Sequence, residues 1–182
     1  MGMRKRAFLF CALAACALAV SAQSYSLRSN ILGLATTNLN LEASMTLNRK
    51  WSLHLPVQYN PFKFGSNRQF RNFYAAPGAR YWLLESYMGG FIGMYGTAGM
   101  YSVGNLFGNK YRYEGEGYGV GLSIGKAYQI GRRWNLEWEV GAGAVWLAYD
   151  KYLCKRCGDL VDSDYGWHFL PTRAALNLVY LF

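Results

Sequence analysis

Two cysteines late in the chain, Cys154 and Cys157, have a spacing that can support three kinds of chemistry. In an exported chain, such a pair is expected to close a disulfide that pins its own segment. A metal site would need more ligands, and the nearby candidates are Asp159, Asp162, Asp164 and His168. A single Cys-x-x-Cys without a second pair is a weak signature for zinc. Redox catalysis by this motif belongs to a thioredoxin-like βαβ pattern, which the sequence lacks.

Only two histidines are available for acid–base chemistry. His54 with Ser52 or Glu42 could supply the base and the orienting group of an enzyme that modifies lipid A or phospholipid. A histidine that is hydrogen-bonded inside a polar interior is the favoured interpretation. His168 lies between two aromatic residues, which is typical of packing at an interface. No nucleophile elbow of the α/β-hydrolase kind is expected, so no catalytic, cofactor-binding or metal-ligating residue is predicted and an enzyme is not expected.

The first residues of the chain predict export. A basic segment at residues 4–6 precedes an apolar stretch at 7–20 that is too short to span a bilayer, and small residues at 20–22 form a cleavage site. We therefore predict a cleaved signal peptide at residues 1–22. A lipoprotein signal ending before Cys16 is the alternative, although it would shorten the apolar core of the leader.

The rest of the chain, residues 23–182, alternates apolar and polar side chains with a period of two. Each alternating segment is one candidate strand, and the segments lie near residues 25–32, 38–47, 51–60, 71–83, 90–103, 117–130, 134–149 and 168–182. The pattern predicts an all-β fold: an eight-stranded antiparallel up-and-down transmembrane β-barrel in the outer membrane of a Gram-negative cell. No segment after the leader is long and apolar enough for a membrane helix.

The expected connections alternate in length around the barrel. Three are short, at residues 48–50, 84–89 and 131–133, and four tend to be longer, at residues 33–37, 61–70, 104–116 and 150–167. Short periplasmic turns and longer extracellular loops are typical of small outer-membrane barrels. An even number of strands places both termini on the periplasmic side.

One face of the predicted strands is apolar enough to contact lipid. Along 134–146 the even positions are tryptophan, leucine, valine or alanine, and Trp134 and Trp146 would lie about 30 Å apart along the membrane normal. We expect aromatic girdles at those two levels. The final strand alternates in the same way up to Tyr180 and Phe182, which we expect to act as the signal that the barrel-assembly machinery recognises.

The opposite face carries charges that balance. The same alternation points three arginines, three glutamates and one histidine inward: Arg28, Glu42, His54, Arg80, Glu137, Glu139 and Arg173. Eight strands enclose room only for side chains, so these groups are expected to pair into a plug rather than line a channel.

The net charge of +9 includes three basic residues of the leader, which leaves an excess of six positive charges in the remainder. That modest excess gives no reason to expect nucleic acid. The expected partners at the membrane are outer-membrane lipids and lipopolysaccharide.

Several short motifs resemble an uncharacterised domain-of-unknown-function family of small outer-membrane barrels from Bacteroides-like bacteria. The motifs are Ser29-Asn30-Ile31-Leu32, Thr36-Thr37-Asn38-Leu39-Asn40, Trp51-Ser52-Leu53, Tyr59-Asn60-Pro61-Phe62, Arg80-Tyr81-Trp82, Trp134-Asn135-Leu136-Glu137, Tyr152 with the two cysteines, and the ending from Pro171. The resemblance implies an outer-membrane barrel and supplies no catalytic residues. Members of that family occur near fimbrial genes, which makes surface or fimbrial proteins expected partners.

Three functions remain open from the sequence. The first is a structural or binding protein that acts through extracellular loops rich in contact-forming side chains, namely Phe62, Phe64, Arg68, Arg71, Tyr111, Arg112 and Tyr113. The second is a barrel enzyme acting on lipid A or phospholipid. The third is a soluble lipocalin-like carrier, which would need the apolar face inside and the charged face outside.

Overall fold

The protein is described by a computed structural model that covers residues 25–64, 68–104, 111–153 and 160–182. It is a closed eight-stranded antiparallel β-barrel, as predicted. Its elements are β1 (Tyr25–Asn30), α2 (Ile31–Ala35), β2 (Leu39–Asn48), β3 (Trp51–Asn60), β4 (Lys63–Phe64), β5 (Arg68–Ala75), β6 (Gly78–Trp82), β7 (Gly89–Gly104), β8 (Tyr111–Gln129), β9 (Trp134–Leu153) and β10 (Leu160–Leu181). Among these described residues, no helix is long and apolar enough to cross a membrane.

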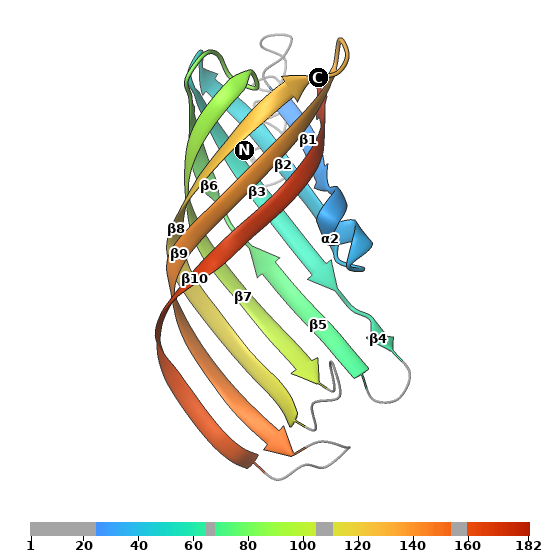
Figure 1. The fold of residues 1–182 in the computed structure, drawn as a ribbon, viewed down its shortest axis with the longest axis vertical. Coiled ribbons are helices and arrows are strands. Elements are labelled where there is room, and N and C mark those ends of the chain that lie inside the picture. Colours follow the sequence, from blue (N-terminus) through green and yellow to red (C-terminus); the bar gives the residue numbers. More distant parts are fainter. Residues whose placement is uncertain (1–24, 65–67, 105–110, 154–159) are drawn as a thin grey trace, which may run out of the picture.

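The barrel closes where the first strand meets the last. Ser26 of β1 lies opposite Leu181 of β10, and β1 pairs on its other edge with β2. The turns at residues 49–50, 83–88 and 130–133 lie at this same end, which we call the short-turn end (Figure 1). The opposite end is the mouth.

The fourth barrel strand is broken in two, whereas the sequence predicted one strand over 71–83. Its halves are β5 and β6, which pair side by side with β3 and β7. Proline at position 77 has no N–H group to donate to the ladder, and Pro56 of β3 lies nearby, with its carbonyl accepting from Ala76 N at 3.2 Å. The interruption therefore follows from two prolines that meet in neighbouring strands.

The prediction that the first strand continues to residue 32 was wrong. Asn30 ends β1 and caps the short helix α2, because its side-chain oxygen accepts from Leu32 N at 3.1 Å. The helix turns the chain back toward β2, and Thr37 adopts a positive φ of 63° in the connection.

The longer loops predicted at 104–116 and 150–167 are largely strand. Tyr111 of β8 pairs with Leu153 of β9, and Leu160 of β10 pairs with Tyr152. The wall formed by β7, β8, β9 and β10 therefore reaches far beyond the wall formed by β1, β2 and β3 (Figure 1). We call the part of this wall at residues 101–104, 111–116, 149–153 and 160–166 the projecting sheet.

A bulge in β10 reverses the alternation of that strand. Arg173 pairs with Gly141 and Pro171 with Ala142, so Thr172 is an extra residue. Before the bulge the odd-numbered side chains face outward, and Trp167 packs against Trp146 with ring centroids 5.7 Å apart. After the bulge the odd-numbered side chains, such as Arg173, face inward. A strand without the bulge would have directed His168 outward instead.

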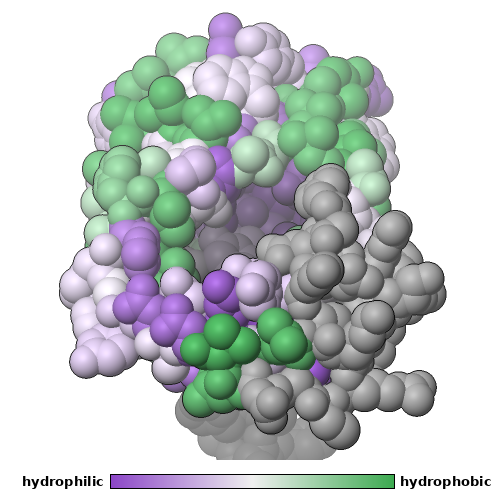
Figure 2. Space-filling view, turned by 60° about the horizontal axis from the view of Figure 1, so that its bottom comes forward, coloured by the Kyte–Doolittle hydropathy of each residue, from purple (hydrophilic) through white to green (hydrophobic). Residues whose placement is uncertain are grey.

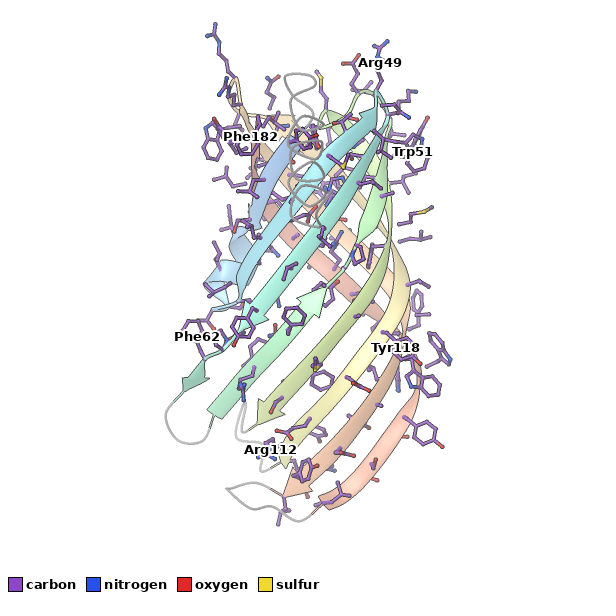
Figure 3. All side chains as sticks on the ribbon, turned by 180° about the vertical axis from the view of Figure 1, so that it is seen from behind. Arg49, Trp51, Phe62, Arg112, Tyr118 and Phe182 are labelled. Atoms are coloured by element: carbon purple, nitrogen blue, oxygen red, sulfur yellow. The ribbon has the colours of Figure 1, made fainter. Side chains whose placement is uncertain are left out.

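The outer face of the barrel is apolar over a broad belt. On β8, for example, Val120, Leu122 and Ile124 have 65%, 64% and 55% of their surface accessible. Aromatic residues border the belt at both ends, and the close pairs are Trp51–Tyr81, Trp134–Tyr180 and Tyr180–Phe182 at the short-turn end and Trp146–Tyr165 and Trp146–Trp167 toward the mouth. Figure 3 shows Trp51, Phe182 and Tyr118 directed away from the barrel axis.

Candidate functional site

A network of buried ion pairs fills the barrel toward the short-turn end. Glu137 and Glu139 project inward from β9 and share the guanidinium of Arg80, at 2.9 and 2.5 Å. Arg28 binds the first carboxylate at 2.6 Å, and Arg173 binds the second at 2.9 Å. The arrangement leaves no carboxylate of this group without a cation.

Glu42 joins the network from the opposite wall. Its Oε1 lies 3.2 Å from Arg80 Nη2, 3.5 Å from Arg28 Nε and 2.8 Å from His54 Nδ1. The structure thus brings together all seven residues that the sequence directed inward. Because they are buried and paired, removal of one member would leave an uncompensated charge.

Glycines on neighbouring strands make room for the large inward side chains. A Cβ on Gly121 would lie 2.6 Å from the ring of Tyr95, and a Cβ on Gly125 would overlap the ring of Phe91. These rings in turn face the network, with Arg173 over Tyr95 and Arg80 over Phe91, both at 4.6 Å from the centroid.

Ser52, His54 and Glu42 form a hydrogen-bonded chain with the order of a catalytic triad. Ser52 Oγ lies 2.6 Å from His54 Nε2, and His54 Nδ1 lies 2.8 Å from Glu42 Oε1. However, Ser52 is completely buried, and its Oγ also accepts from Trp82 Nε1 at 2.7 Å. In this arrangement the hydroxyl is occupied by protein groups and has no access to a substrate.

A second polar layer lies between the network and the turns of the short-turn end. The Tyr87 hydroxyl lies 2.9 Å from Ser44 Oγ, and the Tyr87 carbonyl accepts from Asn135 Nδ2 at 2.7 Å. The ring of Trp82 packs against the ring of Tyr87 on one side and against the ring of Phe91 on another. Tyr87 was not predicted to face the interior, because it lies in a segment predicted as a turn. Its positive φ of 68° is a turn conformation that alternation cannot reveal.

The mouth half is open by contrast. A cavity of about 310 Å³ lies there, and its polar lining includes Gln58, Asn72, Tyr74, Thr97, Tyr101 and Thr172. Figure 2 shows the hollow from this end, with hydrophilic atoms inside it. The buried Tyr74 hydroxyl has no hydrogen-bond partner among the described residues. Burial and, to a lesser extent, the nearby Tyr149 phenol raise the pKa of Tyr101, so its hydroxyl stays neutral.

The inner face of the projecting sheet continues this surface with aromatic residues. Tyr113 and Tyr149 lie with ring centroids 6.0 Å apart, and Lys151 Nζ lies 4.3 Å from the ring centroid of Tyr111. On the opposite face, Arg112 lies over Tyr152 at 5.0 Å. The mouth therefore combines rigid aromatic rings with adaptable polar groups, which suits a contact surface.

The residues predicted as loop anchors are found in several settings. Tyr111, Arg112 and Tyr113 belong to strand β8 rather than to a loop, and Phe62 is exposed beside the mouth (Figure 3). Arg71 is exposed on β5. The backbones of Phe64 and Arg68 lie in β4 and β5.

The cysteine pair lies outside the described residues, as does Asp159, so the predicted disulfide stays a prediction. Asp162 and Asp164 belong to β10 rather than to a loop, and His168 lies in the same strand, as predicted. Among the described residues, no group of three or more potential ligands could hold a metal ion.

Comparison with known proteins supplies the family. Residues 7–182 match a family described as "Protein of unknown function (DUF3575)". The chain belongs to this family. The prediction of an uncharacterised family is thereby confirmed, and the match covers nearly the whole chain. No curated protein and no solved structure matches the chain.

Proposed function

We propose that this DUF3575 member is an outer-membrane barrel that holds a binding surface at its mouth, outside the cell. The observation that carries the proposal is the division of its side chains: charges are buried inside, and an apolar belt bordered by aromatic residues is exposed outside. A lipid bilayer is the solvent that suits such a surface. A lipocalin-like carrier would need the reverse division.

Basic residues at the short-turn end suit the headgroup region of that bilayer. Lys50 lies over Tyr81 at 5.7 Å, Lys126 lies over Tyr128 at 4.9 Å, and Arg133 donates to the Tyr180 hydroxyl at 3.3 Å. Cations that rest on interfacial aromatic rings can reach lipid phosphates from the membrane edge. Phospholipids of the periplasmic leaflet are thus the proposed surroundings of this end, and lipopolysaccharide of the outer leaflet is the proposed surrounding of the mouth end.

Export and assembly are part of the same proposal. Residues 1–22 would direct secretion and be removed, and Tyr180 with Phe182 would guide insertion by the barrel-assembly machinery. Tyr180 faces outward in the last strand and packs against Trp134 at 5.0 Å, which is compatible with recognition of that strand from the lipid side.

The location can be tested by gel mobility after separation of inner and outer membranes. An outer-membrane band that migrates differently before and after boiling is expected, because folded barrels resist detergent. A protein recovered from the soluble periplasm would contradict the proposal and favour a ligand carrier.

The binding surface can be tested with a photo-crosslinking amino acid in place of Tyr113, on the inner face of the projecting sheet. The expected result is an adduct with a surface or fimbrial protein on intact cells. Tyr152 lies on the outer face of the same sheet and is the matched control. Equal adducts at both positions, or none at either, would contradict binding at the mouth.

The second candidate function is a lipid-modifying enzyme, which the Ser52–His54–Glu42 chain favours by its order. Its test is His54→Ala together with Ser52→Ala, assayed for a change in lipid A or phospholipid in cells. An enzyme would lose the lipid modification in both variants while the boiled and unboiled bands still differ. We favour the buried polar plug, since Ser52 is inaccessible.

A further inference from the structure

The last strand of the barrel has a long edge without a neighbouring strand, although the short helix α2 contacts part of β10. β10 pairs with β9 from Leu160 to Tyr180 but pairs with β1 only from Asn177 to Leu181. The side chain of Asn30 extends the second contact a little, since its Nδ2 donates to Ala174 O at 3.3 Å and its Oδ1 accepts from Leu176 N at 3.1 Å. Within the described parts of the chain, residues 160–173 have no strand on this side. We call this stretch the open edge of β10.

The open edge carries large aromatic side chains on its outer face. Its outward side chains are among the most exposed aromatics of the barrel: Phe169 at 80%, Tyr165 at 71% and Trp167 at 61%. Proteins usually blunt such edges with prolines, bulges or charges. Here Pro171 and the bulge at Thr172 lie at one end of the stretch, and Asp162 and Asp164 lie near the other. These two carboxylates accept from Ser163 N at 3.0 Å and from Tyr165 N at 2.8 Å, so an incoming strand would replace two local hydrogen bonds there. Residues 166–170 lack such protection by proline, bulge or charge.

None of the segments between the described strands is long enough to fill this position, and the proposed cleavage after residue 22 removes all but two of the residues that precede β1. The internal segments outside the described residues contain three residues at 65–67 and six each at 105–110 and 154–159. Each is tied at both ends to strands already in the barrel. A strand along residues 160–173 would need a longer stretch, because pairing proceeds residue against residue.

A second copy in the same membrane has the wrong geometry. Two barrels related by a twofold axis along the membrane normal would cross their β10 strands at twice the strand tilt. With a tilt of about 35–45°, the crossing angle is about 70–90°. Neighbouring strands in a sheet differ by only about 20–25°. The open edges of two such copies therefore cannot pair along their length.

We propose that the open edge of β10 accepts an extended segment of another polypeptide, which adds a strand to the projecting sheet. Backbone hydrogen bonds would supply the affinity, and alternate side chains of the incoming segment would contact Tyr165, Trp167 and Phe169 on the outer side. The inference rests on the proposed surface binding and specifies its mode. It also explains why the wall that ends at β10 extends beyond the barrel.

The contact is tested by replacing Tyr165 with a photo-crosslinking amino acid in intact cells. Tyr118 is the control, because it is also exposed on the outer face but lies in β8, in the middle of the sheet. We expect a protein adduct at position 165 that is at least tenfold more abundant than at position 118. Adducts at Tyr113 without any at Tyr165 would overturn strand addition while leaving binding at the mouth intact.

Two neighbouring proline variants, Ser163→Pro and Asp164→Pro, test whether the backbone carries the contact. N–H groups of an antiparallel strand alternate between its two sides, so one proline removes a bond to β9 and the other removes only a donor of the open edge. The variant that loses only a donor of the open edge should keep the boiling-dependent band shift and lose at least nine-tenths of the adduct at Tyr165. A full adduct yield in the folded variant would overturn the proposal.

Hydrogen exchange gives a measurement that does not depend on the variants. The sample is the purified complex of the wild-type barrel with the protein that the adduct at position 165 identifies. In it, backbone amides of residues 161–170 should exchange more slowly than in the barrel alone, while those of residues 118–124 should be unchanged. Equal exchange of residues 161–170 in both samples would overturn strand addition, even if both proline variants fail to fold.

Discussion

The short-turn half and the mouth half of this barrel use the same strands for opposite purposes. Toward the short-turn end, Arg80 binds three carboxylates and every inward charge has a partner within 3.5 Å. Toward the mouth, the interior holds a cavity of about 310 Å³, with an unpartnered hydroxyl on Tyr74 among the described residues. One half is filled and therefore resists change, whereas the other has room for contacts with another molecule. Mutations should therefore cost stability in the first half and alter binding in the second.

The largest loss of stability is expected for Glu137→Gln. Oε1 of Glu137 accepts from Arg28 at 2.6 Å and from Arg80 at 2.9 Å, so the change leaves two buried guanidinium groups short of a counter-charge. We expect the free energy of unfolding to fall by about 3–5 kcal/mol. Urea unfolding of the barrel in lipid vesicles, followed by tryptophan fluorescence, measures it. Glu116→Gln on the exposed surface is the control, and equal costs would show that the plug adds little stability.

The next largest effect is expected where a glycine gives space to a ring. Gly125→Ala would press a methyl group against Phe91 and the Trp138 carbonyl, at a cost of about 1–3 kcal/mol in the free energy of unfolding. Gly96→Ala is the matched control in the neighbouring strand, because its nearest atom, Gly119 O, is 3.9 Å away. The same urea titration compares them. Similar midpoints for the two variants would mean that the interior can relax around Phe91.

The sequence predicted the filled half better than the mouth. Alternation alone directs all seven network residues inward, because a one-residue slip would expose a whole set of charges to the apolar side. In the projecting sheet both faces meet water, so strand residues such as Asp150, Lys151 and Glu114 show no apolar alternation and were assigned to loops. Periodicity reports burial on one side, and it is silent where neither side is buried.

Local backbone features were also beyond the reach of alternation. The bulge at Thr172 is defined by which residues of β9 lie opposite, and pairing partners cannot be inferred from one strand. The break at Pro77 was visible as a proline, but its effect depends on Pro56 in the adjacent strand. The sequence named Ser52, His54 and Glu42 as a possible catalytic group. It could not show that Ser52 is buried, because that depends on the packing of Trp82 against it.

A smaller contrast is expected between two hydroxyl groups, one in each half. Ser52→Ala removes a partner from both His54 and Trp82 and should lower the free energy of unfolding by about 1–3 kcal/mol. Tyr74→Phe removes a buried hydroxyl that has no partner among the described residues, so a change within about 0.5 kcal/mol is expected. Urea midpoints of the two variants provide the comparison. A larger cost for Tyr74→Phe would indicate that the cavity holds an ordered water or ligand.

The smallest effect is expected for the ion pair on the projecting sheet. Arg112 Nε lies 3.2 Å from Glu114 Oε1, and both side chains are about one-third or more exposed. Exposed pairs of this kind contribute little, so the coupling measured by a double-mutant cycle of Arg112→Gln and Glu114→Gln should be below about 0.5 kcal/mol. A coupling above 1.5 kcal/mol would contradict this expectation and show that the pair is held as firmly as a buried one. A weak coupling agrees with a sheet whose exposed charges are free to meet a partner, because little stability is lost when they do.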